Sequence, residues 1–424
     1  MKTKLIAFQI FFFLISIKIN AQHYHVLLDR NVSSISSSES LTSLHHSIYK
    51  MEDSLLPDSF GKKIKPKWLR YTTGCFVRLG KGIFWDFPLS GIFSIAQHEI
   101  FGHGYEYRKL GFSKNHYFIG LPSPYGSGGG GTLNGEGIAR NIGRHERTAT
   151  HYGGVEATRI LSNTIMKKWL LSDSIHYKEA ILAVRAFNSS QYAMLFLGEV
   201  GFRNTDDLNS YLFRVNSFYG FNTTTTYKLT NRHLRKKARL NFLNPFISLG
   251  FLSGIFKYGF QGKKYGELYW FNIGKIKYLP SFRVGLTPFG DEVFFESFIK
   301  LTQIVDGKSP RAARIYYRHG NPVFEKFNGF GIETFHWFNF SEKIILDFNL
   351  DGWIQPELEL GGEEIRLTRA GFGGLVKMNF QIRVWEEPKP VYLSGQIGYK
   401  TDGYIEGEPL DGGLILRYGF AYDF

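Results

Sequence analysis

The 424-residue chain contains one cysteine, Cys75, so a disulfide bond within the chain is excluded. A lone thiol of this kind is usually a small apolar residue. Beyond its first residues the sequence also lacks an unbroken apolar run of about 20 residues, the length that a transmembrane helix needs. The best candidate, residues 246–260, contains Gly250, Gly254 and Lys257, and is predicted to be a buried or interfacial helix.

The first residues, MKTKLIAFQIFFFLISIKINAQ, have the pattern of a secretory signal peptide. A basic start precedes an apolar run, 5–17, that is too short to span a bilayer well, and cleavage is expected after Ala21. A short membrane helix is the alternative. We therefore predict a signal peptide over 1–21, followed by a serine-rich, charged linker or short helix over 22–60.

Acidic residues are outnumbered by basic ones, which leaves a net charge of +14. The positive charges are spread along the chain, apart from the run NRHLRKKAR at 231–239. Because a secreted protein rarely meets nucleic acid, we expect no nucleic-acid partner. The run is better interpreted as a solvated face or as a contact with anionic lipid headgroups.

Aromatic residues make up 17% of the chain and alternate with small or polar residues in its C-terminal part. In LILRYGFAYDF, 414–424, every second residue is Leu, Tyr or Phe. Alternation of this kind predicts a β-strand, and it recurs in KIILDFNLDG and RAGFGGLVKMNFQIRV. Eight antiparallel strands are predicted, or ten if 242–276 holds a hairpin. The eight lie at about 279–288, 291–301, 311–319, 327–340, 342–353, 367–384, 390–400 and 412–424.

The second face of these strands carries too many charges for the core of a globular protein. A membrane barrel turns its apolar face to lipid and lines its interior with polar groups, whereas a soluble sandwich does the reverse. Several strands reach ten or more residues, as a tilted membrane span does. The chain ends on Phe424 in an aromatic strand, which resembles the C-terminal signal of bacterial outer-membrane proteins. We predict an eight-stranded outer-membrane β-barrel over 278–424, with a secreted β-sandwich as the alternative.

The segment before these strands contains the motif HEIFGHG, 98–104. Its helix is expected to begin at Asp86, which can cap it, because apolar residues recur there every three or four positions. His98 and His103 are five residues apart, which leaves their rings about 140° apart on an ideal α-helix. They can share a metal ion only if the helix widens into a π-turn, and Gly102 makes that distortion less costly.

The stretch HEIFGH resembles the H-E-x-x-x-H zinc helix of the dipeptidyl peptidase III family, in which Gly also precedes the second His. The resemblance implies that His98 and His103 bind Zn²⁺ and that Glu99 is the general base. It also implies a Glu ligand on a later helix, for which Glu156 is the candidate. The family has a Glu-Glu pair there and this chain has Glu156 alone, so the likeness supports a type of site rather than overall homology. The alternative is a pair of helix histidines without a metal.

Other residues near the motif have weaker expectations. His151 is a fallback third ligand, whereas His116 and His145 are expected at the surface. The Gly-rich stretch 120–137 is not expected to form a regular element, and is either a flap over a cleft or an exposed loop. An oxyanion partner is also needed, and the candidates are Arg159, Tyr105 and Tyr152.

These patterns together predict an α+β multidomain chain, in which a mainly helical, zinc-peptidase-like periplasmic domain over 61–277 precedes the barrel. Zinc on His98, His103 and Glu156 would lower the pKa of a bound water, and Glu99 would take its proton to hydrolyse a peptide bond. The expected partners are the outer-membrane bilayer, a periplasmic peptide or protein, and other outer-membrane proteins. A catalytically degenerate scaffold subunit and a lipid-directed hydrolase are the alternative functions.

Overall fold

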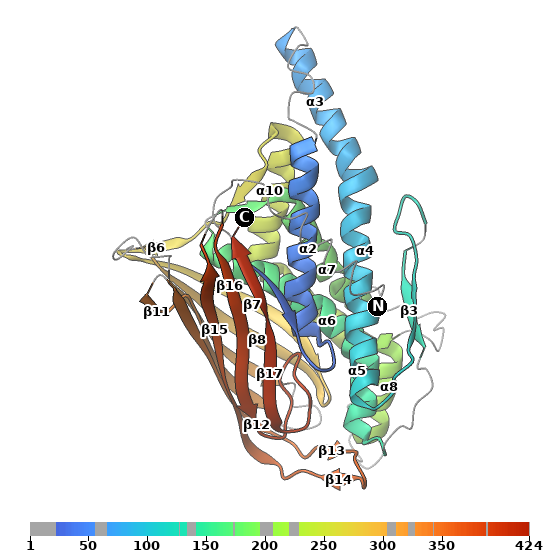
Figure 1. Ribbon diagram of the computed structural model, residues 1–424. Helices are drawn as coiled ribbons and strands as arrows, with labels where there is room; N and C mark the ends of the chain where they lie inside the picture. Colours follow the sequence, from blue (N-terminus) through green and yellow to red (C-terminus); the bar gives the residue numbers. More distant parts are fainter. Residues whose placement is uncertain are drawn as a thin grey trace, which may run out of the picture.

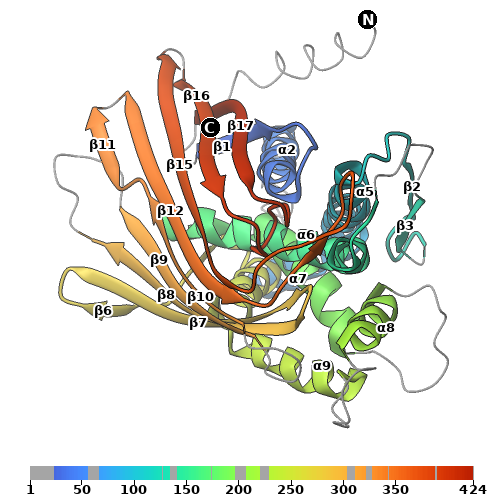
Figure 2. The same ribbon diagram turned by 90° about the horizontal axis from the view of Figure 1, so that it is seen from below.

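The protein is an α+β chain in which a large curved antiparallel sheet holds helices against its concave side (Figures 1 and 2). The computed structural model describes residues 23–55, 66–126, 128–133, 141–172, 174–195, 207–219, 229–302, 311–320, 327–341, 343–386 and 389–423. The predicted signal peptide lies outside the described residues, so it stays a prediction.

Eleven strands form the large sheet, in the order β1-β17-β16-β15-β12-β10-β9-β8-β7-β6, and β11 pairs with β12. They are β1 (His23–Leu28), β6 (Phe271–Ile273), β7 (Ile276–Thr287), β8 (Gly290–Leu301), β9 (Ala312–Gly320), β10 (Asn328–Phe335), β11 (Phe338–Ser341), β12 (Ile344–Gln355), β15 (Gly371–Trp385), β16 (Val391–Lys400) and β17 (Gly413–Asp423). Each of the eight segments predicted from alternation overlaps one of these strands, and the fourth overlaps both β10 and β11. Strand positions were therefore predicted well.

The prediction of a closed eight-stranded barrel is wrong. In the part of the chain that the structure describes, β1 and β6 are the two edges of the sheet and no pairing joins them. Strand β1 adds to the outer side of β17, from His23 opposite Asp423 to Leu28 opposite Tyr418. Alternation in the sequence determines which residues lie on each face of a strand. Whether the sheet closes into a barrel also depends on what occupies its concave side, and here helices occupy it (Figure 2).

The helical segments precede the long strands. They are α2 (Ser34–Leu55), α3 (Lys67–Lys81), η1 (Gly82–Asp86), α4 (Phe87–His98), η2 (Glu99–His103), α5 (Gly104–Lys109), α6 (Arg144–Leu171), α7 (Tyr177–Leu195), α8 (Asp207–Tyr219), α9 (Asn231–Ala238), η3 (Arg239–Leu243), η4 (Phe246–Phe251), α10 (Leu252–Phe256) and η5 (Lys257–Gln261). Short strands pair as β2 (His116–Ile119) with β3 (Gly130–Leu133), β4 (Ser174–His176) with β5 (Tyr265–Glu267), and β13 (Glu359–Leu360) with β14 (Arg366–Leu367).

The serine-rich segment predicted as a linker or short helix contains β1 and the 22-residue helix α2. Several of its serines are buried, because their small side chains let α2 lie close to its neighbours. Ser38 shares a hydrogen bond of 2.9 Å with Thr164 of α6, and Ser37 donates to Gln97 of α4 at 3.1 Å. Serine content therefore reflects close helix packing here rather than a solvated connection.

One helical segment runs from Lys67 to Lys109 without a break, through α3, η1, α4, η2 and α5 (Figure 1). The expectation that a helix begins at Asp86 is therefore wrong. Asp86 has helical backbone angles and caps nothing. Its carboxylate is buried, pairs with Lys81 at 2.7 Å and accepts a hydrogen bond from Tyr177.

Residues 246–260 are helical, as predicted, and are divided among η4, α10 and η5. Phe246 and Phe251 are buried on one side, while Leu249 and Phe256 are exposed on the other. Across the described ranges, no helix is both long enough and apolar enough to cross a membrane.

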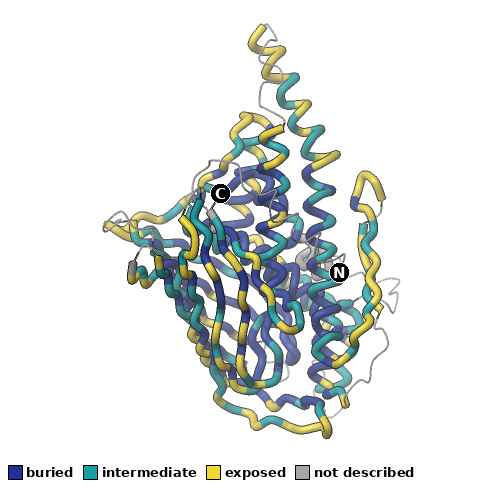
Figure 3. The backbone as a smooth tube through the Cα atoms, in the orientation of Figure 1, coloured by how far each residue is buried: buried dark blue, intermediate teal, exposed yellow. Residues whose placement is uncertain are grey.

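The two faces of the sheet differ in polarity, and the structure decides their orientation. Charged strand residues point to the concave side and are buried there, where Arg314 pairs with Glu333 at 3.2 Å and Arg417 pairs with Glu408 at 2.7 Å. The convex side is apolar and exposed, and Phe372 on β15 is 90% exposed. Burial alternates along the strands for this reason (Figure 3). A water-soluble sandwich would bury the apolar face instead.

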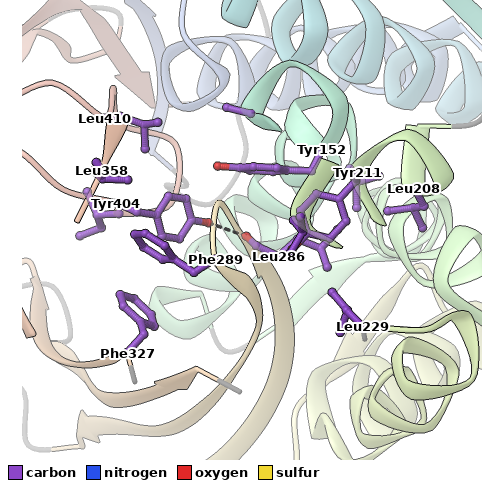
Figure 4. Packing of buried hydrophobic residues seen from close by; sticks show 14 of the residues in the cluster. Tyr152, Leu208, Tyr211, Leu229, Leu286, Phe289, Phe327, Leu358, Tyr404 and Leu410 are labelled. Atoms are coloured by element: carbon purple, nitrogen blue, oxygen red, sulfur yellow. Dashed lines mark hydrogen bonds between the residues drawn. The ribbon is translucent and has the colours of Figure 1, made fainter. Parts of the chain in front are cut away.

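The hydrophobic core joins residues from both sides of the expected boundary at 277/278. Tyr152 of α6 and Tyr211 of α8 belong to the same buried cluster as Leu286 of β7 and Tyr404 (Figure 4). Tyr404 donates a hydrogen bond of 2.8 Å to the carbonyl oxygen of Leu286. The helices and the sheet are thus packed on a shared core, which places α6 firmly beneath the strands.

Candidate metal centre

The motif helix widens where the spacing of its histidines requires it. Residues Glu99–His103 form the π-helix η2 inside the long helix, and His98 immediately precedes it. The predicted π-turn is confirmed. The rings of His98 and His103 are brought to a centroid distance of 5.0 Å, at an angle of 69°.

A third side chain completes the group, and it comes from the first turn of α8. The Oδ2 atom of Asp207 lies 3.0 Å from Nε2 of His98 and 3.1 Å from Nε2 of His103. The two Nε2 atoms are 3.3 Å apart. Three atoms that are common metal ligands therefore converge on one point, and together they form a group that can hold a metal ion.

Glycines of two helices create the space for this convergence. A Cβ atom on Gly154 of α6 would lie 2.5 Å from Nε2 of His103 and would also overlap Nε2 of His98. A Cβ atom on Gly102 would lie 2.6 Å from Cα of Gly154. Gly102 is therefore required for the close approach of η2 to α6, in addition to the flexibility for which the sequence suggested it.

His103 is oriented by the backbone of α6. Its Nδ1 lies 2.7 Å from the carbonyl oxygen of Thr150, so Nδ1–H donates and Nε2 is left to face Asp207. Burial lowers the pKa of His103, but the charge of Asp207 and its hydrogen bond outweigh burial and raise that pKa to about 9. Burial raises the pKa of Asp207, yet the two imidazoles hold it well below its usual range. The group thus favours a positive charge at the centre of the three atoms.

Glu99 lies beside the group and is held by the Gly-rich segment. Its Oε2 accepts a hydrogen bond of 2.8 Å from the hydroxyl of Thr132, which lies on β3. Gly130 packs against it, since a Cβ atom there would lie 2.5 Å from Cγ of Glu99. The expectation that 120–137 contains no regular element is therefore wrong for 130–133, which pair with β2. Residues 134–137 lie outside the described residues.

Glu156, the third ligand that the resemblance implied, is not part of the group. Its Oε1 accepts hydrogen bonds from the hydroxyl of Tyr404 at 2.9 Å and from the backbone N–H of Gly407 at 3.2 Å. Two residues along an α-helix turn about 200°, so Glu156 faces away from the side of α6 on which Gly154 meets the histidines. Burial raises the pKa of Glu156 to about 8.

The structure agrees with some of the remaining predictions about this region and not with others. His116 is exposed, as predicted. His145 was also expected at the surface but is buried, and its Nε2 shares a hydrogen bond of 2.9 Å with the hydroxyl of Tyr219. His151 is partly buried and lies outside the three-residue group. Of the three oxyanion candidates, Arg159 is buried and bound to a carboxylate of Glu406 at 2.6 Å. The other two, Tyr105 and Tyr152, are buried as well.

The sequence analysis missed Asp207. It lies 104 residues after His103, and no local spacing connects the two positions. The single signal was an acidic residue at the start of the amphipathic segment DLNSYLFRVNSFY. Many helices begin with an acidic residue, because it complements the helix dipole, so this signal alone does not predict a ligand.

Comparisons of the chain with protein families, with characterised proteins and with solved structures find no match. The centre is therefore interpreted from its own geometry.

Proposed function

We propose that this chain is a zinc-dependent hydrolase that cleaves peptide bonds, with His98, His103 and Asp207 as ligands and Glu99 as general base. The observation that carries the proposal is the convergence of the three ligand atoms within 3.0–3.3 Å of one another across a π-turn. In tetrahedral zinc sites with nitrogen and oxygen ligands, neighbouring ligand atoms lie about 3.3 Å apart. The three atoms thus fit the ion with almost no rearrangement.

The surroundings of the ligands fit zinc as well. Histidine ligands usually donate their second ring N–H to a carbonyl or carboxylate, as His103 does to Thr150. Two histidines and one carboxylate form the ligand set of many catalytic zinc sites, in which the fourth position is open. When bound, zinc would supply Lewis acidity and a water of lowered pKa.

Glu99 is suited to move the proton of that water. Thr132 binds Oε2 of Glu99 and fixes the carboxylate, which leaves Oε1 to accept the proton and later to return it to the leaving amine. Since Thr132 belongs to β3, the β2–β3 hairpin links the position of the general base to the segment that borders the site.

Zinc content and hydrolysis test the proposal separately. The purified protein should contain one zinc ion per chain, and His103→Ala should remove it. Glu99→Gln should retain zinc but slow the hydrolysis of a peptide library by about 10²–10⁴-fold, because a base is lost while the ligands remain. His116→Ala, at an exposed histidine outside the group, is the matched control and should change neither quantity.

The alternatives are outcomes of the same measurements. A protein that binds zinc but hydrolyses no peptide, in the wild type as in Glu99→Gln, would be a scaffold with a structural metal site. Hydrolysis of lipid esters in place of peptides would indicate a lipid-directed hydrolase. A wild-type protein that binds no zinc would contradict the proposed function.

We propose further that the chain is attached to a bacterial outer membrane through the convex face of the sheet, with the helical part in the periplasm. Contiguous apolar patches of more than a few hundred Å² are rare on water-soluble monomers. Here the consecutive strands β15, β16 and β17 expose Phe372, Tyr399 and Tyr418 at 90%, 62% and 66%. Charged residues lie on the other side, as they do in proteins whose strands face lipid.

Flotation with vesicles of phosphatidylethanolamine and phosphatidylglycerol tests the attachment. The wild-type protein should float with the vesicles, and Phe372→Asp combined with Tyr418→Asp should reduce the bound fraction several-fold. Phe118→Asp is the matched control, because Phe118 is 67% exposed on β2, away from the convex face. A protein that is monodisperse without detergent and does not float would contradict the attachment.

A further inference from the structure

A second polar space lies inside the curve of the sheet, separate from the metal centre. It is a cavity of about 270 Å³ between the C-terminal half of α6 and the concave face of the strands. Residues from α2, α6, β9, β10, β12, β15 and β16 contribute to its walls. None of His98, His103, Asp207 or Glu99 lines it.

The cations of the cavity wall are neutralised. Among the described residues, every lysine and arginine that lines it lies within ion-pair distance of a carboxylate. These side chains are Lys167, Lys168, Arg283, Arg314, Arg318 and Lys377. An anionic ligand would therefore have to compete with carboxylates that are already in place.

One carboxylate of the wall has no such partner. Asp347 of β12 is 8% exposed and accepts hydrogen bonds from two backbone N–H groups, that of Trp337 at 2.9 Å and that of His336. Within the described ranges, no Lys, Arg or His forms an ion pair with it. A buried carboxylate without a cation is costly unless it becomes neutral or is paired.

Unpaired amide oxygens surround Asp347 on the same face. Asn379 of β15 lies directly opposite Asp347 in the strand register, and Asn349 is two residues further along β12. The side-chain oxygens of Asn349, Asn379 and Gln381 are buried and accept no hydrogen bond from the described residues. Asn349 is 9% exposed and Gln381 is 6% exposed. The wall therefore presents one carboxylate without a paired cation and three amide oxygens that receive no hydrogen bond from the described residues.

We infer that this cavity binds a small primary amine, whose ammonium group is held by Asp347 and by the side-chain oxygens of Asn349 and Asn379. An ammonium group has three N–H donors, which the unpaired oxygens can accept, and one positive charge, which can pair with the carboxylate of Asp347. The volume limits the ligand to a small molecule, since about 270 Å³ is near the lower end of ligand pockets. The inference does not depend on the proposed hydrolase, because the two sites share no residue.

Calorimetric titration of the full-length protein with n-butylamine, butyrate and n-butanol tests the ligand class. Butylamine should bind at millimolar concentration or below, and butyrate should bind at least about tenfold more weakly. Asp347→Asn should weaken butylamine binding by about tenfold or more, because it removes the charge but keeps the shape. Asn379→Asp should strengthen it by adding a second charge.

Asp402→Asn is the matched control, because Asp402 lies outside the cavity and pairs with Arg366. It should leave butylamine binding unchanged. Melting temperatures and zinc content of each variant show that the fold is retained. Three results would overturn the inference: butyrate binding as tightly as butylamine, butylamine binding that Asp347→Asn does not weaken, or no binding of any probe, which would leave a cavity that holds water only.

Discussion

Replacing Asp207 with asparagine distinguishes the ligand set of the structure from one that contains Glu156. The size of the expected loss of zinc affinity can be estimated from the electrostatic effect of Asp207 on His103. Against the effect of burial, the charge and hydrogen bond of Asp207, together with the charge of Glu99 and the hydrogen bond to Thr150, raise the pKa of His103 from 6.5 to about 9. That rise in pKa corresponds to about 3 kcal/mol of stabilisation of one positive charge by the surrounding groups, of which Asp207 contributes most. A divalent ion carries a larger charge, so Asp207→Asn should weaken zinc binding by at least about 100-fold.

Glu156→Gln should leave zinc binding unchanged. Burial raises the pKa of Glu156 to about 8, so at pH 7 most of this carboxyl group is protonated and resembles an amide in shape and charge. Its Oε1 accepts both of its hydrogen bonds, from Tyr404 and Gly407, and the amide oxygen of glutamine can accept the same two. The variant should therefore fold normally, which makes it a matched control for the loss of a carboxylate.

The assay is competition for zinc between each variant and a chromophoric chelator at pH 7, with metal content measured after dialysis. Wild type and Glu156→Gln should retain one zinc ion per chain, and Asp207→Asn should lose it. If Glu156→Gln lost zinc while Asp207→Asn kept it, the ligand set would be the one that the sequence resemblance implied, and the geometry described above would be refuted.

Three further predictions concern the surroundings of the site. Gly154→Ala should abolish zinc binding and leave the circular dichroism spectrum unchanged, because the added Cβ would lie 2.5 Å from Nε2 of His103. Gly131→Ala is the control and should leave zinc binding unchanged, because its Cβ would meet no atom within 4 Å. Thr132→Val should lower kcat by about tenfold with zinc retained, because it removes the hydrogen bond to Glu99, and equal loss in Thr132→Ser would argue against this role. The pKa of Glu156 is higher in the folded chain, about 8, than its ordinary value of 4.5, so the folded state binds its proton more tightly. The free energy of unfolding should therefore fall as pH rises from about 4.5 to 8, by up to about 1.4 kcal/mol per pH unit, and denaturant titrations should show a shallower slope for Glu156→Gln.

Several features were predictable because they depend on short stretches of chain. Alternation along a strand has a period of two residues, so the positions of the long strands, such as β12 and β15, could be read from their side chains. The five-residue spacing of His98 and His103 is likewise local, and it allowed only a widened helix if the two rings were to meet, which η2 confirms. Glu99 follows His98 directly in the chain, and its role as general base was implied by the resemblance of HEIFGH to a zinc helix.

Other features depend on contacts between distant segments. The serine-rich start of the described chain lacks an apolar pattern, yet β1 completes one edge of the sheet because its backbone pairs with β17, nearly 400 residues later. The closed barrel was wrong for a related reason, since neighbouring strands specify their own pairing but not whether the two edges meet. The helices on the concave side decide that.

By itself, the sequence determined the eight long strands and the π-turn that the histidine spacing requires, since both follow from local periodicity and sterics, and the resemblance of HEIFGH to a zinc helix implied two of the three candidate ligands. Only the tertiary structure decided the third ligand and the orientation of the sheet. Asp207 reaches the histidines because α8 packs against α6, whereas Glu156 points to Tyr404 on the opposite side of α6. The charged face of the sheet is the inner one because it pairs with buried groups of the helices, as Glu333 does with Lys167. The third ligand and the orientation of the sheet both depend on the free energy of contacts between segments far apart in the chain, which cannot be predicted from a local sequence pattern.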